Sequence, residues 1–225
     1  MRIFVIIPAL NEEKSIPKVI HDIPKNIVSE IIVVNNASTD NTAFVAKSVG
    51  AIVLDEPQKG YGYACLKGMA YVETKQPDIL VFMDADYSDF PEELPLLIEP
   101  ILKKKADLVI GSRALGSKES GSMTIPQIFG NWLATRLLYF FYGVKFTDLG
   151  PFRAIRWDAL QQLNMQDKTY GWTVEMQLKA AKNNLKCVEV AVNYRKRIGY
   201  SKVSGTIKGT FMAGYKILWT IFKYL

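Results

Sequence analysis

The chain has few of the residues that build disulfide scaffolds or histidine metal sites. Its 225 residues include two cysteines, Cys65 and Cys187, and one histidine. Neither cysteine has a second cysteine or a histidine at metal-site spacing, which excludes a zinc module and is typical of a reducing compartment. A chain of this length buries roughly 70% of its unfolded surface without such staples. We therefore expect one domain spanning residues 1–225.

Long apolar runs are also missing. No stretch reaches the roughly 18 apolar residues of a spanning helix, because Arg136 interrupts residues 125–146 and two lysines interrupt the C-terminal stretch. The apolar N-terminus ends at Pro8, too short for a signal peptide and better explained as a strand. No repeat or linker separates the halves. We expect a cytoplasmic protein that does not cross a membrane by itself.

Positive charge is concentrated at the C-terminal end. The net charge is +6, and residues 186–225 carry +7 of charge against about −1 for the rest of the chain. The basic residues in this stretch are Lys186, Arg195, Lys196, Arg197, Lys202, Lys208, Lys216 and Lys223. Nucleic acid, an anionic bilayer and a phosphorylated substrate are all candidate partners for them.

The first 110 residues alternate β-branched runs with helical patterns, which is typical of an α/β fold with a parallel sheet. The expected strands are 3–8, 30–34, 51–54, 79–83 and 107–110. Helices are expected around residues 16–23, 94–102, 128–142, 173–183 and 206–225, with a late strand at 187–194. We assign 1–115 as the half that would bind a nucleotide sugar and 116–225 as the acceptor half.

Polar residues follow four of these strands and should meet in one crevice, because ligands bind beyond the carboxyl ends of parallel strands. Among them, Asp84 and Asp86 close the fourth strand two residues apart, so both carboxylates face the same way. Two such groups can hold Mg²⁺ or Mn²⁺ together with substrate phosphate. Lys59 and Gly60 stand where a loop enters a helix, a suitable place for phosphate or ribose.

Taken in order, these motifs resemble the family 2 glycosyltransferases, which have the GT-A fold, a Rossmann-like, mostly parallel sheet flanked by helices. The resemblance is to the branch with dolichyl-phosphate mannose synthase and other polyprenyl-phosphate glycosyltransferases. The motifs are Pro8-Ala9-Leu10-Asn11-Glu12, Asn35-Asn36, Lys59-Gly60, Asp84-Ala85-Asp86, Gly111-Ser112-Arg113, Thr147-Asp148, Phe152-Arg153 and the segment 197–202.

The resemblance implies roles for individual residues. Those implied to border the nucleotide sugar are Pro8, Asn11, Glu12, Asn36, Lys59, Gly60, Asp84 and Ala85. Asp84 and Asp86 are implied to hold the metal, and Arg113, Arg153, Arg197, Ser201 and Lys202 an acceptor phosphate. We place Asp86, Arg113, Arg153 and Glu175 in the catalytic set.

The chain departs from the family pattern in three places. Asparagine stands at both 35 and 36, where the family usually has an acid at one of the two positions; Ser88 replaces a glutamine ligand; and Gly150-Pro151 replaces a serine-bearing turn. These changes affect the donor base, the metal site and the acceptor pocket.

The acceptor decides the mechanism. A lipid phosphate, with a second pKa near ~6, is already anionic and attacks directly, whereas a hydroxyl needs a general base such as Glu175 or Asp148. We favour inverting transfer of a hexose from a nucleotide diphosphate sugar to a polyprenyl phosphate. Transfer to a sugar or small-molecule hydroxyl is the alternative. A basic nucleic-acid-binding module leaves the acidic strand ends unexplained, so no nucleic-acid partner is expected.

The C-terminal helix is expected either to lie on a membrane or to pack in the core. Lys208, Lys216 and Lys223 fall within about 80° of arc on it, beside large apolar groups. Several such lysines would hold the enzyme peripherally to the inner face of the cell membrane. Snorkelling lysines on a core helix would give the same pattern.

Overall fold

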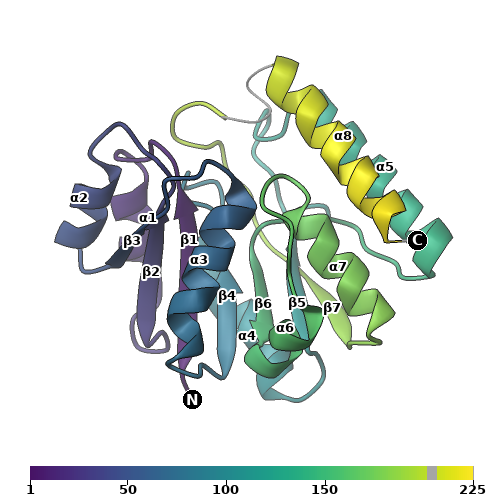
Figure 1. The fold of residues 1–225 in the computed structure, drawn as a ribbon, viewed down its shortest axis with the longest axis horizontal. Coiled ribbons are helices and arrows are strands. Elements are labelled where there is room, and N and C mark those ends of the chain that lie inside the picture. Colours follow the sequence, from purple (N-terminus) through teal and green to yellow (C-terminus); the bar gives the residue numbers. More distant parts are fainter. Residues whose placement is uncertain (202–206, 225) are drawn as a thin grey trace.

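The computed structural model describes residues 1–201 and 207–224 (Figure 1). The strands are β1 Ile3–Ala9, β2 Glu30–Asn35, β3 Ile52–Asp55, β4 Ile79–Phe82, β5 Leu108–Ser112, β6 Arg153–Arg156 and β7 Cys187–Ala191. They form a seven-stranded sheet in the order β3-β2-β1-β4-β6-β5-β7. All neighbouring pairs are parallel except those that involve β6, which runs antiparallel to β4 and β5. The predicted α/β fold with a mostly parallel sheet in a single domain is confirmed.

Helices cover both faces of this sheet. They are α1 Ile16–Asp22, α2 Thr42–Ser48, α3 Tyr61–Glu73, α4 Leu94–Leu102, α5 Ile125–Tyr142, α6 Trp157–Leu163, α7 Trp172–Lys182 and α8 Ile207–Lys223, with a 3₁₀ turn at Pro91–Glu93. Side chains on a strand alternate between faces, so Phe4 and Ile6 of β1 join the core under α3, α6 and α7. Val5 and Ile7 join the core under α1, α2 and α4.

The last helix lies beside α5 at one end of the molecule (Figure 1). Phe141 of α5 and Phe222 of α8 meet edge to face with ring centroids 5.7 Å apart. The hydroxyl of Tyr142 donates to the carbonyl of Ile221 at 3.0 Å, and both helices also contact α7. Within the described residues, no helix is both long enough and apolar enough to cross a membrane.

The structure differs from the sequence prediction mainly in the second half. Strand β6 and helices α2 and α6 were not predicted, and β7 ends at Ala191 rather than at residue 194. Helix α5 begins at Ile125, because Thr124 and Gln127 form a capping box that fixes the start three residues before the predicted one. Both halves contribute strands to one continuous sheet.

Gly62, in the first turn of α3, lies against the loop between α6 and α7. A Cβ atom there would meet the carbonyl oxygen of Asp167 at 2.0 Å. We expect Gly62→Ala to lower the free energy of unfolding by about 1–3 kcal/mol, because the loop backbone must move. Gly130→Ala on α5 is the control, since its Cβ would meet no described atom within 4 Å. Urea denaturation measures both, and equal stability of the two variants would contradict this packing.

Candidate active site

A cleft of about 540 Å³ opens at the carboxyl ends of the parallel strands. It lies where the chain order reverses between β1 and β4, the usual position of a ligand site in such sheets. The predicted site residues that line it are Pro8, Glu12, Asn36, Lys59, Gly60, Asp84, Ala85, Asp86, Arg113, Arg197 and Ser201. The predicted convergence of strand ends is therefore present in the structure.

Asp84 and Asp86 follow β4 and carry most of the negative charge of the cleft. Burial, followed by the neighbouring Asp86 carboxylate, raises the pKa of Asp84 to about 7. One oxygen of Asp86 accepts the backbone N–H of Ser88 at 2.9 Å, and the other lies 2.6 Å from the Arg197 guanidinium. The buried Asp89 adjoins them, and burial together with both carboxylates raises its pKa well above the usual range.

This donor set fits a hard divalent cation. Adjacent carboxylates that repel each other in a buried site are stabilised by a bound cation, and Mg²⁺ and Mn²⁺ favour oxygen ligands. No cluster of three or more His, Cys, Asp or Glu side chains suited to a metal occurs among the described residues. An ion held by Asp84 and Asp86 would therefore take its other ligands from water and a substrate phosphate.

Arg113 comes from the end of β5 and enters the cleft already paired. Its guanidinium donates to both carboxylate oxygens of Asp148, at 2.7 and 2.6 Å, and its backbone N–H donates to the same group. Although burial acts in the opposite direction, Asp148 raises the pKa of Arg113 further above its usual value. Glu189 in turn accepts the backbone N–H groups of Thr147 and Asp148. The Arg113 cation is thus fixed in place and permanently charged.

Asn36 lines the cleft, but its amide is occupied by the protein. Its carbonyl oxygen accepts the N–H of Gly60 at 2.8 Å, and its NH₂ group donates to the carbonyl of Gln58 at 2.6 Å. These bonds hold the loop that presents Lys59. Asn36 therefore orders this loop at the part of the cleft where the resemblance implies the nucleotide sugar.

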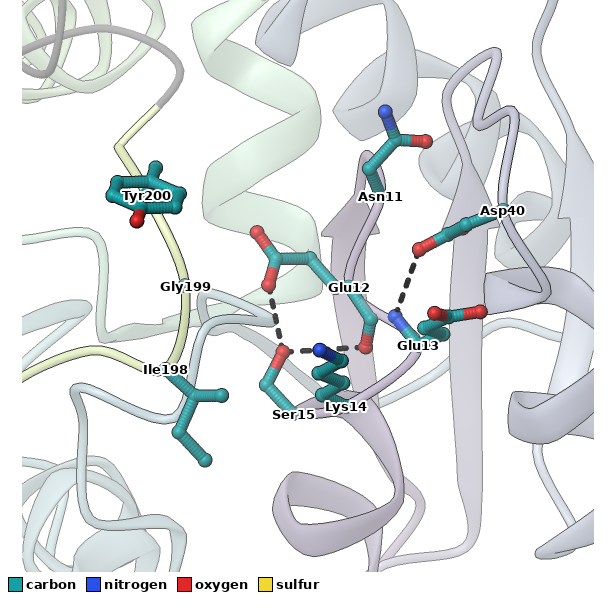
Figure 2. Close-up of a pocket in the computed structure, with 9 residues that line it drawn as sticks. All are labelled: Asn11, Glu12, Glu13, Lys14, Ser15, Asp40, Ile198, Gly199 and Tyr200. Carbon is teal, nitrogen blue, oxygen red and sulfur yellow. Dashed lines mark hydrogen bonds between the residues drawn. The ribbon is translucent and has the colours of Figure 1, made fainter.

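A smaller hollow of about 250 Å³ adjoins the cleft beside the end of β1 (Figure 2). Asn11, with a φ of 55°, lies at its rim, and its side-chain oxygen accepts the N–H of Thr39 at 2.7 Å. The Glu12 carboxylate borders both spaces and accepts from the hydroxyl of Ser15 at 2.7 Å. Across the hollow, Figure 2 shows Tyr200 facing Asn11 and Glu12 from the segment that follows β7.

Arg153 was predicted to hold an acceptor phosphate, and this prediction is wrong. The side chain is fully buried at the start of β6 and is not among the residues that line the cleft. It donates to the carbonyl oxygens of Leu149, Gly150 and Thr173, and burial lowers its pKa to about 10. Arg153 instead ties the turn before β6 to the start of α7, and both segments form the cleft wall.

Glu175 was considered as a catalytic base, and its position in the structure contradicts that role. The side chain is fully buried on α7 and does not line the cleft. Its oxygens accept the N–H groups of Gln166 and Asp167 and the hydroxyl of Tyr224, and Lys179 lies 2.7 Å away. The carboxylate therefore holds the loop between α6 and α7 and connects it to the end of the chain. Asp148, the other candidate base, is buried under Arg113.

The sequence analysis missed several residues of the acceptor wall. Gln127 and Asn131 face the cleft from α5, and Thr169 and Tyr170 face it from the loop before α7. Two polar residues four apart on a mostly apolar helix share one of its faces, which is the signal that identifies Gln127 and Asn131. Lys202 and the side chain of Lys208 lie outside the described residues.

Comparisons with known proteins agree with this geometry. An uncharacterised glycosyltransferase of Mycobacterium tuberculosis is 37% identical over 93% of this chain and 93% of its own length. An undecaprenyl-phosphate mannosyltransferase of Micrococcus luteus is 33% identical over 93% of this chain and 90% of its own. Glucosyl-3-phosphoglycerate synthase of M. tuberculosis, crystallised with Mn²⁺, UDP-glucose and phosphoglyceric acid, has a TM-score of 0.79. The structural match covers 99% of this chain and 79% of the synthase chain. At 24% sequence identity, this match shows the shared fold alone.

Residues 4–163 match the family described as Glycosyl transferase family 2, which is well over half of the chain. The family match is supported by the acidic pair that follows β4 and by a relative that is more than 30% identical over nine-tenths of both chains. The chain therefore belongs to glycosyltransferase family 2.

Proposed function

We propose that this protein transfers a hexose, with inversion, from a nucleotide diphosphate sugar to a polyprenyl phosphate, and that Mg²⁺ or Mn²⁺ assists the reaction. The observation that carries the proposal is a single cleft with two unlike sides. One side holds the half-buried Asp84 and the buried Asp86. The other is formed by α5 and α8, which also carry large exposed apolar side chains outside the cleft. The similarity to an undecaprenyl-phosphate mannosyltransferase supports the choice of acceptor.

The donor would lie along the strand ends of the first half. Pro8, Glu12 and the loop 59–60 border the part of the cleft next to the acidic pair. Asp84 and Asp86 would hold the ion, which when bound neutralises the charge that develops on the departing diphosphate. Asn11, whose side-chain oxygen accepts the N–H of Thr39, and Ala85, which lines the cleft, would shape the surface on which the nucleotide rests.

The charges on the acceptor side favour a phosphate over a hydroxyl. The carboxylates that line the described cleft are Glu12, Asp84 and Asp86, and all three follow β1 or β4 on the donor side. Arg113, Arg197 and Ser201 line the same cleft, and Arg197 lies 2.6 Å from Asp86. A phosphate monoester is anionic near neutral pH and needs no base, and paired cations suit its oxygens. Lys202 would add to this group.

The chain's own residues would therefore orient two anions toward each other. Arg113, fixed by Asp148, would keep the attacking phosphate oxygen near the anomeric carbon of the sugar. Arg197 would share its charge between Asp86 and the phosphates. Enclosure by Tyr170 and Trp172 at the wall would exclude water, which competes as an acceptor.

The exposed surfaces of helices α5 and α8 support a membrane location for this reaction. Large apolar side chains that are between about half and four-fifths exposed gather on α5 and α8, namely Ile125, Ile128, Phe129, Trp132, Tyr139, Phe140, Phe211, Met212, Tyr215, Trp219 and Phe222. Apolar patches of this kind mark interaction surfaces, and Trp and Tyr favour the membrane interface. Lys145 and Lys223, both exposed, would contact anionic lipid headgroups at its margin.

The proposal is tested with purified protein, a set of radiolabelled nucleotide sugars, and two acceptors, a short-chain polyprenyl phosphate and phosphoglyceric acid. We expect labelled lipid to form with Mn²⁺ and not with chelator. Transfer to phosphoglyceric acid alone would contradict the lipid acceptor while leaving the donor chemistry intact. Absence of any transfer from every donor would refute the proposed function.

Asp86→Asn should abolish transfer, because an amide holds a divalent ion and Arg197 far more weakly than a carboxylate does. We expect the transfer rate to fall by more than about 100-fold. Removing a residue that only orients metal ligands typically costs about 10- to 100-fold. Asp158→Asn is the control, since that carboxylate is 64% exposed at the start of α6. Initial rates at saturating donor, with circular dichroism to verify folding, measure the effect. An Asp86→Asn enzyme with wild-type rates would remove the metal assignment.

Glu175→Gln should destabilise the fold without affecting the chemistry. The amide would leave one of the N–H groups of the loop at 166–167 without an acceptor, which lowers the free energy of unfolding by about 1–3 kcal/mol. Glu99→Gln is the matched control, because Glu99 has the same i,i+4 lysine partner on an exposed helix surface. Transfer per folded molecule should equal that of the wild type. A rate loss of several orders of magnitude with unchanged stability would instead support the hydroxyl acceptor with Glu175 as base.

Phe211→Ser on α8 should weaken binding to vesicles, because a phenylalanine that enters the interface contributes about 1.5–3 kcal/mol. Phe44→Ser is the control, since Phe44 is also 74% exposed but belongs to α2, which lies on the other side of the molecule from α8 (Figure 1). Co-sedimentation with phosphatidylglycerol-containing vesicles measures the partition, and we expect a fall of about tenfold for Phe211→Ser alone. Equal binding of both variants would exclude α8 from the contact.

A further inference from the structure

The segment that follows β7 runs beside the loop that carries the acidic pair. Asp89 and Tyr194 form an isolated antiparallel bridge between the two. The backbone N–H of Arg195 donates to the carbonyl of Ser88 at 3.0 Å, and that of Ile198 donates to the carbonyl of Asp86 at 2.9 Å. These bonds join residues more than 100 positions apart in the sequence into one two-stranded unit.

Arg195 extends this unit with its side chain. Its guanidinium lies 3.4 Å from the centroid of the Tyr87 ring and 4.2 Å from that of Phe90. It also donates to the carbonyl of Tyr87 at 2.7 Å and to that of Asp89 at 3.1 Å. A planar guanidinium makes stacking and hydrogen-bonding contacts together, which an ammonium group does not. Arg195 thus contacts the turn 87–90 from two directions.

A second anchor connects this turn to α1. The hydroxyl of Tyr87 donates to Asp22 at 2.6 Å, and the Arg195 guanidinium lies 3.9 Å from the same carboxylate. Tyr87 has a φ of 66°, a left-handed conformation that costs a side-chain-bearing residue on the order of 1–3 kcal/mol. The contacts with Asp22 and Arg195 hold it there, and this conformation turns the chain back immediately after Asp86.

The position of Arg195 separates its role from that of Arg197. Arg197 lines the cleft and pairs with an oxygen of Asp86 at 2.6 Å. Arg195 does not line the cleft, and its side chain contacts the turn 87–90 and Asp22. The backbone bonds from Arg195 to Ser88 and from Ile198 to Asp86 lie on either side of Arg197, so the segment that carries Arg197 is held beside Asp86.

We propose that Arg195 is a positioning residue for the metal and diphosphate site. It holds the turn after Asp86 and the segment carrying Arg197 in one register, so that the Asp86 carboxylate and the Arg197 cation keep their relative geometry when substrate phosphate enters. The inference rests on the proposed function, since it assigns Arg195 to the same site, and it adds a residue that the cleft itself does not contain.

Arg195→Lys tests this role because it keeps the charge and removes the stacked, two-carbonyl geometry. We expect the affinity for Mn²⁺ in the presence of a nucleoside diphosphate to fall roughly 10- to 100-fold, as for residues that orient metal ligands. Isothermal titration and the electron paramagnetic resonance signal of free Mn²⁺ measure this without any transfer reaction. Arg156→Lys is the matched control. Arg156, the last residue of β6, also donates two hydrogen bonds from its guanidinium, in this case to the carboxylate of Asp158.

Thermal unfolding separates positioning from stability. A folded Arg195→Lys variant with weakened Mn²⁺ binding, beside an unchanged Arg156→Lys variant, supports the role. Should Arg195→Lys fail to fold, Phe90→Leu removes one stacking face only and is expected to weaken Mn²⁺ binding by a smaller factor. Wild-type Mn²⁺ affinity in whichever of these two variants folds overturns the inference. Wild-type protein that binds no Mn²⁺ with any nucleoside diphosphate refutes the proposed function itself.

Discussion

The rest of the site depends on the need to compensate buried negative charge at the end of β4. Asp84, Asp86 and Asp89 fall within six residues just after a strand that is buried on both faces, where unpaired carboxylates are strongly unfavourable. The chain supplies cations from distant positions, with Arg113 from β5 and Arg197 from the segment after β7. These requirements bring three separate parts of the sequence to one edge of the sheet, and a bound divalent ion would complete the compensation.

Other charged residues around the cleft serve to fix its walls. Asp148 orients Arg113, Glu175 holds the loop before α7, and Arg153 ties that helix to the turn before β6. Each of these side chains is fully or almost fully buried, and each finds its partners within the protein. A wall built in this way leaves few groups free to rearrange. The reacting groups are therefore presented by a rigid frame, which is what catalysis by orientation requires.

The sequence predicts the first half well and the second half less well for a physical reason. Strands such as β1 and β4 are buried on both faces and appear as apolar runs. Their ends and the polar residues after them can therefore be identified in the sequence. Strand β6 has four residues with an arginine at each end, so no apolar run marks it. The roles of Arg153 and Glu175 were misjudged because Arg153 donates to backbone carbonyls and Glu175 accepts backbone N–H groups of the loop before α7, and the sequence does not show such backbone partners.

The two helices α5 and α8 show why the sequence left the choice between core and membrane open. Each packs apolar side chains inward, such as Leu138 and Ile221, and exposes others outward, such as Phe140 and Phe211. A helix that is apolar on most of its circumference needs a second apolar environment besides the protein core. An acceptor with a charged head and an apolar chain has two requirements, a charged site for its head and an apolar phase for its chain. The acidic and basic groups at the strand ends meet the first, and a lipid phase against α5 and α8 would meet the second.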